Sequence, residues 1–192
     1  MISELIRNNR SCRRFHQQVP IDVDTLKSLV ELARQSASAA NLQPLRYLLA
    51  CSPEANRDIF DCLAWAAYLK DWPGPEEGEK PAAYIVMLGD TNQTNRFDCD
   101  VGIAAQSILL GAREAGLAGC MLGAIRRKRL RKCLQIADHL EILLVIAIGK
   151  PKERVVIDTV GEDGDIRYWR DENGVHHVPK RALSDIIVDI RC

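Results

Sequence analysis

The 192 residues include 26 basic and 26 acidic side chains, so the formal net charge is zero and gives no reason to expect binding to nucleic acid or to a membrane. The seven cysteines are scattered and form no Cys-x-x-Cys pair, which argues against zinc ribbons and thioredoxin-like motifs. An odd number of unclustered cysteines is typical of a reduced, cytoplasmic protein. The longest apolar run, residues 142–148, is far too short to span a bilayer.

Two helices are predicted near the N-terminus. Residues 23–35 place their apolar side chains on one face, and Asp22 or Asp24 can cap the first turn. A second helix begins at Ser52-Pro53, with serine as the N-cap and proline as the first helical residue, and is expected to continue to about Leu69. Further along, the pattern predicts strands at 46–51, 83–89, 118–122 and 141–149, and helices at 98–115 and 126–134.

Helices and strands alternate through most of the chain, which predicts a sheet covered by helices in one domain, residues 1–192. The helix at 98–115 is so apolar that we expect it at the centre or at a subunit interface. Near the C-terminus, residues 166–170 and 175–178 flank Asn173-Gly174, which predicts a β-hairpin. This hairpin and a tail with a short helix after Leu183 occupy about residues 164–192.

Basic residues near both ends of the chain are candidates for binding phosphate. Arg10, Ser11 and Arg13 lie in one short segment, where guanidinium groups and a hydroxyl can hold a phosphate, although a solvated basic turn is the alternative. Lys180 and Arg181 could add phosphate contacts from the C-terminal end. Neither glycine-rich nucleotide-binding motif, G-x-G-x-x-G or G-x-x-x-x-G-K-[ST], is present, so any nucleotide must be bound in another way.

Two further segments are candidates for contact with a flat ligand. The first follows a predicted helix, and its small residues allow close approach of the backbone while its hydroxyl and amide groups offer hydrogen bonds. The second lies where a predicted strand ends, and its backbone N–H groups could donate to a heterocycle. An ordinary loop and a simple strand exit are the alternatives. The segments consist of Ala37, Ser38, Ala39, Asn41 and Gln43, and of Leu122, Gly123 and Ala124.

Taken in order, these segments resemble the nitroreductase family. Asn9-Arg10-Ser11-Cys12-Arg13-Arg14-Phe15 is similar to the family pattern Arg-Arg-Ser-x-Arg-x-Phe. Ala37-Ser38-Ala39-Ala40-Asn41-Leu42-Gln43-Pro44-Leu45 is similar to Pro-Ser-x-x-Asn-x-Gln-Pro-Trp. Asn9, Ala37 and Leu45 depart from these patterns, where arginine, proline and tryptophan are usual.

The resemblance implies an α+β, three-layer α/β/α fold with a mostly antiparallel central sheet, and a homodimer with FMN at the subunit interface. Arg10, Ser11, Lys180 and Arg181 would then hold the FMN phosphate or ribityl chain, and Arg13 would approach the N1/O2 edge of the flavin. Backbone groups of residues 122–124 would lie near flavin N5, and the segment 37–43 would come from the partner subunit. NADH or NADPH would give hydride to N5, and a nitroaromatic, quinone or activated alkene would accept it by a ping-pong mechanism.

Alternatives remain open. The chain could be a flavin-binding or flavin-sensing module without turnover, with Trp65, Tyr68 and Trp72 as a lid, or a dehalogenating or flavin-cleaving member of the superfamily. Six basic residues within 126–132 suggest nucleic-acid binding, although a solvated helix face is the better interpretation. We predict no metal site and no catalytic acid or base. The four histidines, His16, His139, His176 and His177, are expected at the surface or in the hairpin.

Overall fold

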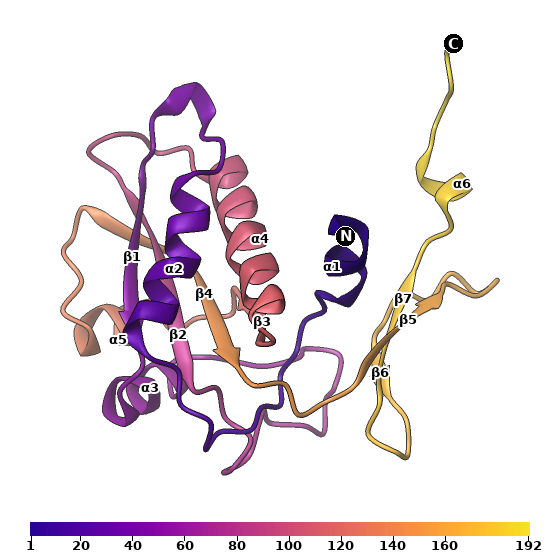
Figure 1. The fold of residues 1–192 in the computed structure, drawn as a ribbon, viewed down its shortest axis with the longest axis horizontal. Coiled ribbons are helices and arrows are strands. Elements are labelled where there is room, and N and C mark those ends of the chain that lie inside the picture. Colours follow the sequence, from indigo (N-terminus) through magenta and orange to yellow (C-terminus); the bar gives the residue numbers. More distant parts are fainter.

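A computed structural model describes residues 1–192, and its centre is a four-stranded sheet (Figure 1). The strand order is β1-β2-β4-β3, and each neighbouring pair is antiparallel. The expected mostly antiparallel central sheet is therefore confirmed. The four strands are β1 (Leu45–Ala50), β2 (Ala83–Asp90), β3 (Ala118–Leu122) and β4 (Leu140–Gly149).

Two hydrophobic cores cover the two faces of this sheet. Successive side chains of a strand point to opposite faces, and in β2 Ile85 and Met87 belong to one core while Tyr84 and Val86 belong to the other. The first core is closed by α2 (Val23–Arg34) and α4 (Asp98–Glu114), which lie together on one face in Figure 1. The second is closed by α3 (Pro53–Phe60) and α5 (Arg127–Cys133). These layers confirm the expected α/β/α arrangement.

Helix α3 is shorter than the sequence predicts. The predicted caps are present, because Asp22 accepts the Thr25 N–H at 2.6 Å at the start of α2 and Ser52 accepts the Ala55 N–H at 3.2 Å at the start of α3. The prediction that α3 continues to Leu69 is wrong. After Phe60 the backbone pairs with the segment beyond β3 instead: Arg126 N–H donates to the Cys62 carbonyl at 2.8 Å, and Ala64 N–H to the Ala124 carbonyl at 3.0 Å.

Residues 151–192, which we call the C-terminal arm, stand away from the rest of the chain, the body (residues 1–150), in Figure 1. The arm contains a second sheet of order β5-β7-β6. Its β6–β7 pair is antiparallel around Gly174, whose φ of +75° suits glycine, so the expected hairpin is confirmed. Strand β5, which was not predicted from the sequence, pairs in parallel with β7. The elements are β5 (Val155–Thr159), β6 (Trp169–Arg170), β7 (His176–Lys180) and α6 (Leu183–Ile186).

The chain between α1 (Ile2–Asn8) and α2 joins the arm to the body. Its Phe15 is fully buried and forms a bridge with Pro151, directly against Gly149. A Cβ at Gly149 would lie 2.7 Å from the Phe15 ring, so only glycine allows this contact. Nearby, the buried Glu79 carboxylate binds Arg14 through two bonds of 2.6 Å and Lys152 at 2.8 Å. None of the helices combines the length and apolar character needed to cross a bilayer.

Candidate functional site: a basic pocket between the N-terminal segment and the arm

A pocket of about 340 Å³ lies where the N-terminal segment, β3 and the arm meet. The sequence-predicted residues Arg10, Ser11, Arg13 and Lys180 all line it, although they come from opposite ends of the chain. Arg181 is exposed and is not part of this wall. The other lining residues are Asn9, Gln106, Leu109, Met121, Tyr168, His176 and Val178. The structure thus gathers two separate basic segments around one cavity, as an anion-binding site requires.

Arg13 is held in place by residues of the arm. One terminal guanidinium nitrogen (NH1) lies 3.3 Å from Nε2 of His176, and its Cζ lies 5.0 Å from the centre of the Tyr168 ring. Its backbone N–H donates to Glu153, whose other carboxylate oxygen accepts from Arg170 at 2.8 Å. A cation stacked on an aromatic ring and bonded to a buried group keeps little rotational freedom. The arm therefore orients this arginine in the pocket wall.

His176 lies in the hairpin, one of the two places expected for the histidines, but sequence reasoning missed its burial and its position in the pocket. It is fully buried, and burial, followed by the charge of Arg13, lowers its pKa to about 4. The imidazole is therefore neutral at pH 7. Because Arg13 donates toward Nε2, we assign the ring proton to Nδ1, which is buried without a partner. Strong alternation of polar and apolar residues in β7 is absent, so no sequence signal marked this position as buried.

Arg10 also keeps an unsatisfied donor beside the pocket. One guanidinium nitrogen (NH2) donates to the Ile6 carbonyl at 2.8 Å, but its Nε is buried without a partner. Buried donors without acceptors are destabilising and rare in folded proteins. Guanidinium, hydroxyl and ammonium groups around one cavity form a donor set that suits a phosphate. The residues present therefore fit the phosphate end of a phosphorylated ligand.

The second predicted segment lies elsewhere on the chain, in a loop that contains the short helix η1 (Ala39–Asn41). The Ser38 hydroxyl donates to the buried carboxylate of Asp100, which also accepts the Ala39 N–H at 3.0 Å. Asp100 is in the first turn of α4, whereas Gln106 and Leu109 of the basic pocket are two turns further on. In a single chain this loop therefore does not join the basic pocket.

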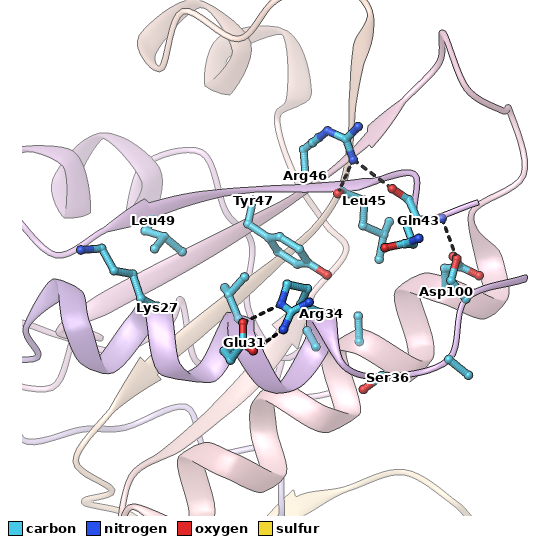
Figure 2. Close-up of a pocket in the computed structure, with 15 residues that line it drawn as sticks. Lys27, Glu31, Arg34, Ser36, Gln43, Leu45, Arg46, Tyr47, Leu49 and Asp100 are labelled. Carbon is cyan, nitrogen blue, oxygen red and sulfur yellow. Dashed lines mark hydrogen bonds and ion pairs between the residues drawn. The ribbon is translucent and has the colours of Figure 1, made fainter. Parts of the chain in front are cut away.

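The loop has an unusual backbone and borders a different pocket. Ala40, Asn41 and Gln43 have φ values of 49°, 54° and 50°, and such left-handed residues other than glycine often occur at functional sites. Ala37, Ser38 and Gln43 line a pocket of about 370 Å³ between α2 and β1, which Figure 2 shows. There Tyr47 reaches from β1 toward the Glu31–Arg34 ion pair on α2.

The third predicted segment, residues 122–124, comes directly after Met121 in the chain. Met121 of β3 lines the pocket, and Leu122 is buried at the end of that strand. Gly123 and Ala124 are exposed, and a Cβ at Gly123 would meet no other atom within 4 Å. The backbone here is thus accessible to a ligand that extends beyond the pocket along the end of β3.

Three of the six basic side chains in the run 126–132 form contacts within the chain. Arg127 donates to the Ile142 carbonyl at 2.9 Å, and Arg131 to the Leu140 carbonyl at 2.8 Å. Arg129 forms an ion pair with Asp61 at 3.1 Å. These arginines bind carbonyl groups and an acidic side chain of the same chain, which supports the interpretation of the run as part of the fold.

Fold and pocket together define an α+β protein whose helix-covered antiparallel sheet has a pocket lined by basic residues at one edge. The sequence model of the nitroreductase family matches residues 6–150, and the chain belongs to that family. Its membership and its fold, both expected from the motifs, are confirmed.

Several characterised or solved proteins are similar to this chain. The putative NAD(P)H nitroreductase YodC of Bacillus subtilis is 24% identical over 177 residues, covering 77% of this chain and 88% of the relative. The FMN reductase (NADPH) of the same organism is 25% identical, covering 77% of this chain and 65% of the relative. A nitroreductase family protein from Clostridium novyi shares the fold with a TM-score of 0.65 and 19% identity, covering 93% of this chain and 94% of that protein.

Proposed function

We propose that the protein is a homodimeric, FMN-dependent oxidoreductase that takes reducing equivalents from NADH or NADPH and passes them to a small electron acceptor. The basic pocket formed by Arg10, Ser11, Arg13 and Lys180 is the observation that supports this most strongly. Family membership and the names of the relatives, an NAD(P)H nitroreductase and an FMN reductase, point to the same class. FMN, when bound, supplies hydride transfer between the nicotinamide and a nitroaromatic, quinone or activated alkene.

The residues of this chain bind and orient the cofactor. Arg10, Ser11 and Lys180 hold the phosphate and ribityl end, with Arg181 close by in sequence. Arg13, oriented by His176 and Tyr168, presents a positive charge to the pyrimidine edge of the flavin, where negative charge develops on reduction. The backbone groups of Leu122, Gly123 and Ala124 would lie near flavin N5. If donor and acceptor use the same place above the ring in turn, the kinetics are ping-pong.

A homodimer explains why the site is divided in one chain. The loop with Ala37, Ser38, Ala39, Asn41 and Gln43 does not join the basic pocket of its own chain, but a partner related by twofold symmetry can supply it. The arm supports this assembly, because an isolated chain leaves its apolar side chains in water. Exposed members include Ile157, Trp169, Leu183, Ile186, Val188 and Ile190, with Val188 at 100% exposure.

The alternative of a flavin-binding module with an aromatic lid receives little support. Trp65 is only 8% exposed and belongs to the second core, and Trp72 lies beneath Arg170, whose Cζ is 4.2 Å from its ring centre. Tyr68 alone is half-exposed, and its ring is tilted by 53° against that of Tyr168, with the ring centres 4.9 Å apart. Two of the three aromatic residues are thus occupied in packing.

Flavin binding tests the proposal. The purified protein should absorb near ~450 nm as an oxidised flavoprotein and bleach with NADH or NADPH without oxygen. Arg10→Ala should weaken FMN binding roughly 10- to 100-fold by removing a charge-assisted phosphate contact, and should leave riboflavin binding unchanged. Arg13→Ala should weaken both. Arg7→Ala is the control, because Arg7 is exposed on α1 outside the pocket.

Two results would contradict the proposal. The first is a colourless protein that does not bind added FMN. The second is a protein that is monomeric in solution yet binds FMN, and whose affinity for FMN is the same in the wild type and in Arg10→Ala. A flavin that binds but is never bleached by NADH or NADPH would favour the non-catalytic module instead.

A further inference from the structure

Cys62 and Cys133, far apart in the sequence, meet on the α3–α5 side of the sheet. Cys62 follows the end of α3 and is fully buried, whereas Cys133 is the last residue of α5 and is exposed. Neither belongs to the basic pocket or to the loop assigned to the cofactor. Their contact is therefore independent of the proposed function.

Contacts along one face of α5 bring these two residues together. Arg126, just before the helix, donates its N–H to the Cys62 carbonyl at 2.8 Å. Arg129 binds the Asp61 carboxylate at 3.1 Å and its carbonyl at 3.4 Å. Residues three and four apart share a helix face, so Cys133 lies on the same face one turn after Arg129. The face of α5 that contacts Asp61 and Cys62 therefore carries Cys133 as well, which makes the two cysteines neighbours.

The two thiols differ in their access to solvent. Burial raises the pKa of Cys62, and Cys133 and Asp61 raise it further, while Arg129 lowers it. Cys133 is open to solvent and can meet an oxidant first. Cys12 and Cys120 form a second pair of cysteines. Both are buried, and burial raises the pKa of each to about 12. That pair is shielded and provides an internal comparison.

We propose that Cys62 and Cys133 form a reversible intramolecular disulfide when the protein meets a hydroperoxide. The Cys133 thiolate attacks the peroxide, the O–O bond breaks, and Cys133 becomes a sulfenic acid while water or an alcohol leaves. The Cys62 sulfur then attacks that sulfenic acid, the S–S bond forms, and water leaves. Two thiols lose two electrons and two protons, and the peroxide is reduced. A dithiol reductant reverses the reaction.

This bond would fasten the end of α3 to the end of α5. The chain between them includes the pairing of Ala64 with Ala124, directly after Leu122 and Gly123. Oxidation would therefore add a covalent bond beside the hydrogen bonds that hold the segment after β3 against residues 62–64.

Peptide mapping tests the proposal. The purified full-length protein is treated with excess hydrogen peroxide, its remaining thiols are blocked, and it is digested with trypsin. Tryptic peptides 58–70 and 133–152 should be joined by a disulfide, at a mass two hydrogen atoms below their sum, and dithiothreitol should separate them. The link should be absent in Cys133→Ser, whose exposed position leaves folding intact, and in Cys62→Ala.

Cys99→Ser and Cys192→Ser are matched controls, because both residues are exposed and neither lies at this contact. Each should leave the 58–70 to 133–152 link unchanged. The proposal is overturned if Cys133 in the wild type is oxidised only to sulfinic or sulfonic acid, or pairs only between molecules. It is equally overturned if peptide 58–70 of the oxidised wild type is joined mainly to a peptide that carries a cysteine other than Cys133.

Discussion

The body and the C-terminal arm contain the same kinds of residue but bury them very differently. Of the 46 buried residues, His176 is the single one in the arm, although the arm is rich in isoleucine and valine. In the body, each strand of the sheet has a helix layer to pack against. The arm has two-residue and five-residue strands and no layer above them. Apolar sequence alone does not make a core, because a second surface must cover it.

The body and the arm each supply part of the lining of the basic pocket. The body supplies Arg10, Ser11 and Arg13, and the arm supplies Tyr168, His176 and Lys180. The ion pair of Glu79 with Lys152 and the hydrogen bond from the Arg13 backbone N–H to Glu153 join the two regions next to this pocket. The position of the arm on its own body is therefore fixed by charges and hydrogen bonds, while its apolar tail remains available to a partner.

Removal of the tail should have the largest effect. A protein truncated after Arg181 keeps the pocket but loses the apolar residues 183–190. We expect a monomer and a loss of FMN affinity of roughly 100-fold, because the partner's loop is no longer held. Light scattering with size-exclusion chromatography and flavin titration measure both. Truncation of Arg191 and Cys192 alone is the control, and a tail-less dimer that retains flavin would contradict the comparison.

Glu79→Gln should separate the arm from the body. Glu79 is 3% exposed and neutralises Arg14 and Lys152, whose side chains are 29% and 41% exposed, so its loss leaves two partly solvated cations without a partner and costs about 2 kcal/mol of unfolding free energy. Chiefly through Arg14, the pKa of Glu79 falls to about 2, below its ordinary value of 4.5. The stabilisation is therefore present above pH 4.5 and disappears toward pH 2.

Urea unfolding of wild type and variant at pH 7 and pH 3 checks this expectation. Glu77→Gln is the matched control, because the Glu77 side chain is 77% exposed and binds Lys80 at the surface. An equal and small change in both variants would show that Glu79 contributes no more than a surface pair.

His176→Asn should have a smaller effect that depends on pH. The folded-state pKa of about 4 lies below the ordinary 6.5, so the unfolded chain binds more protons between these values. The wild type should be most stable above pH 6.5 and lose stability as the pH falls toward 4. His176→Asn should remove this slope. In the folded protein the imidazole becomes charged only near pH 4, so flavin binding should weaken only as the pH falls to that value, where protonated His176 repels Arg13. His16→Asn, outside the pocket, is the control, and an unchanged slope in His176→Asn would contradict the assignment.

The smallest effect is expected within the body, at α5. Arg131→Ala removes hydrogen bonds to the carbonyls of Ile136, Ala137 and Leu140 and should cost about 1 kcal/mol. Lys128→Ala, exposed on the same helix, should change stability very little. Thermal unfolding of both variants distinguishes the hydrogen-bonding role of Arg131 from the effect of removing a surface charge. Equal losses of stability would show that the basic run 126–132 acts through its total charge.

The sequence by itself determined the features that depend on neighbouring residues. Asp22 and Ser52 mark helix starts because their side chains accept N–H groups three residues on. Asn173-Gly174 marks the hairpin because glycine takes positive φ without strain. The ordered motifs also predicted the family and the α/β/α fold, and they named Arg10, Ser11, Arg13 and Lys180, which the structure brings together.

The tertiary structure decided what depends on distant partners. Helix α3 ends at Phe60 because Cys62 and Ala64 pair with residues 124–126, which no local pattern encodes. His176 is buried because the arm folds it against Arg13 and Tyr168. Capping residues and turns act over a few residues of chain, whereas burial and strand pairing depend on which surfaces meet. Propensity therefore fixes the elements, and packing fixes their ends and their roles.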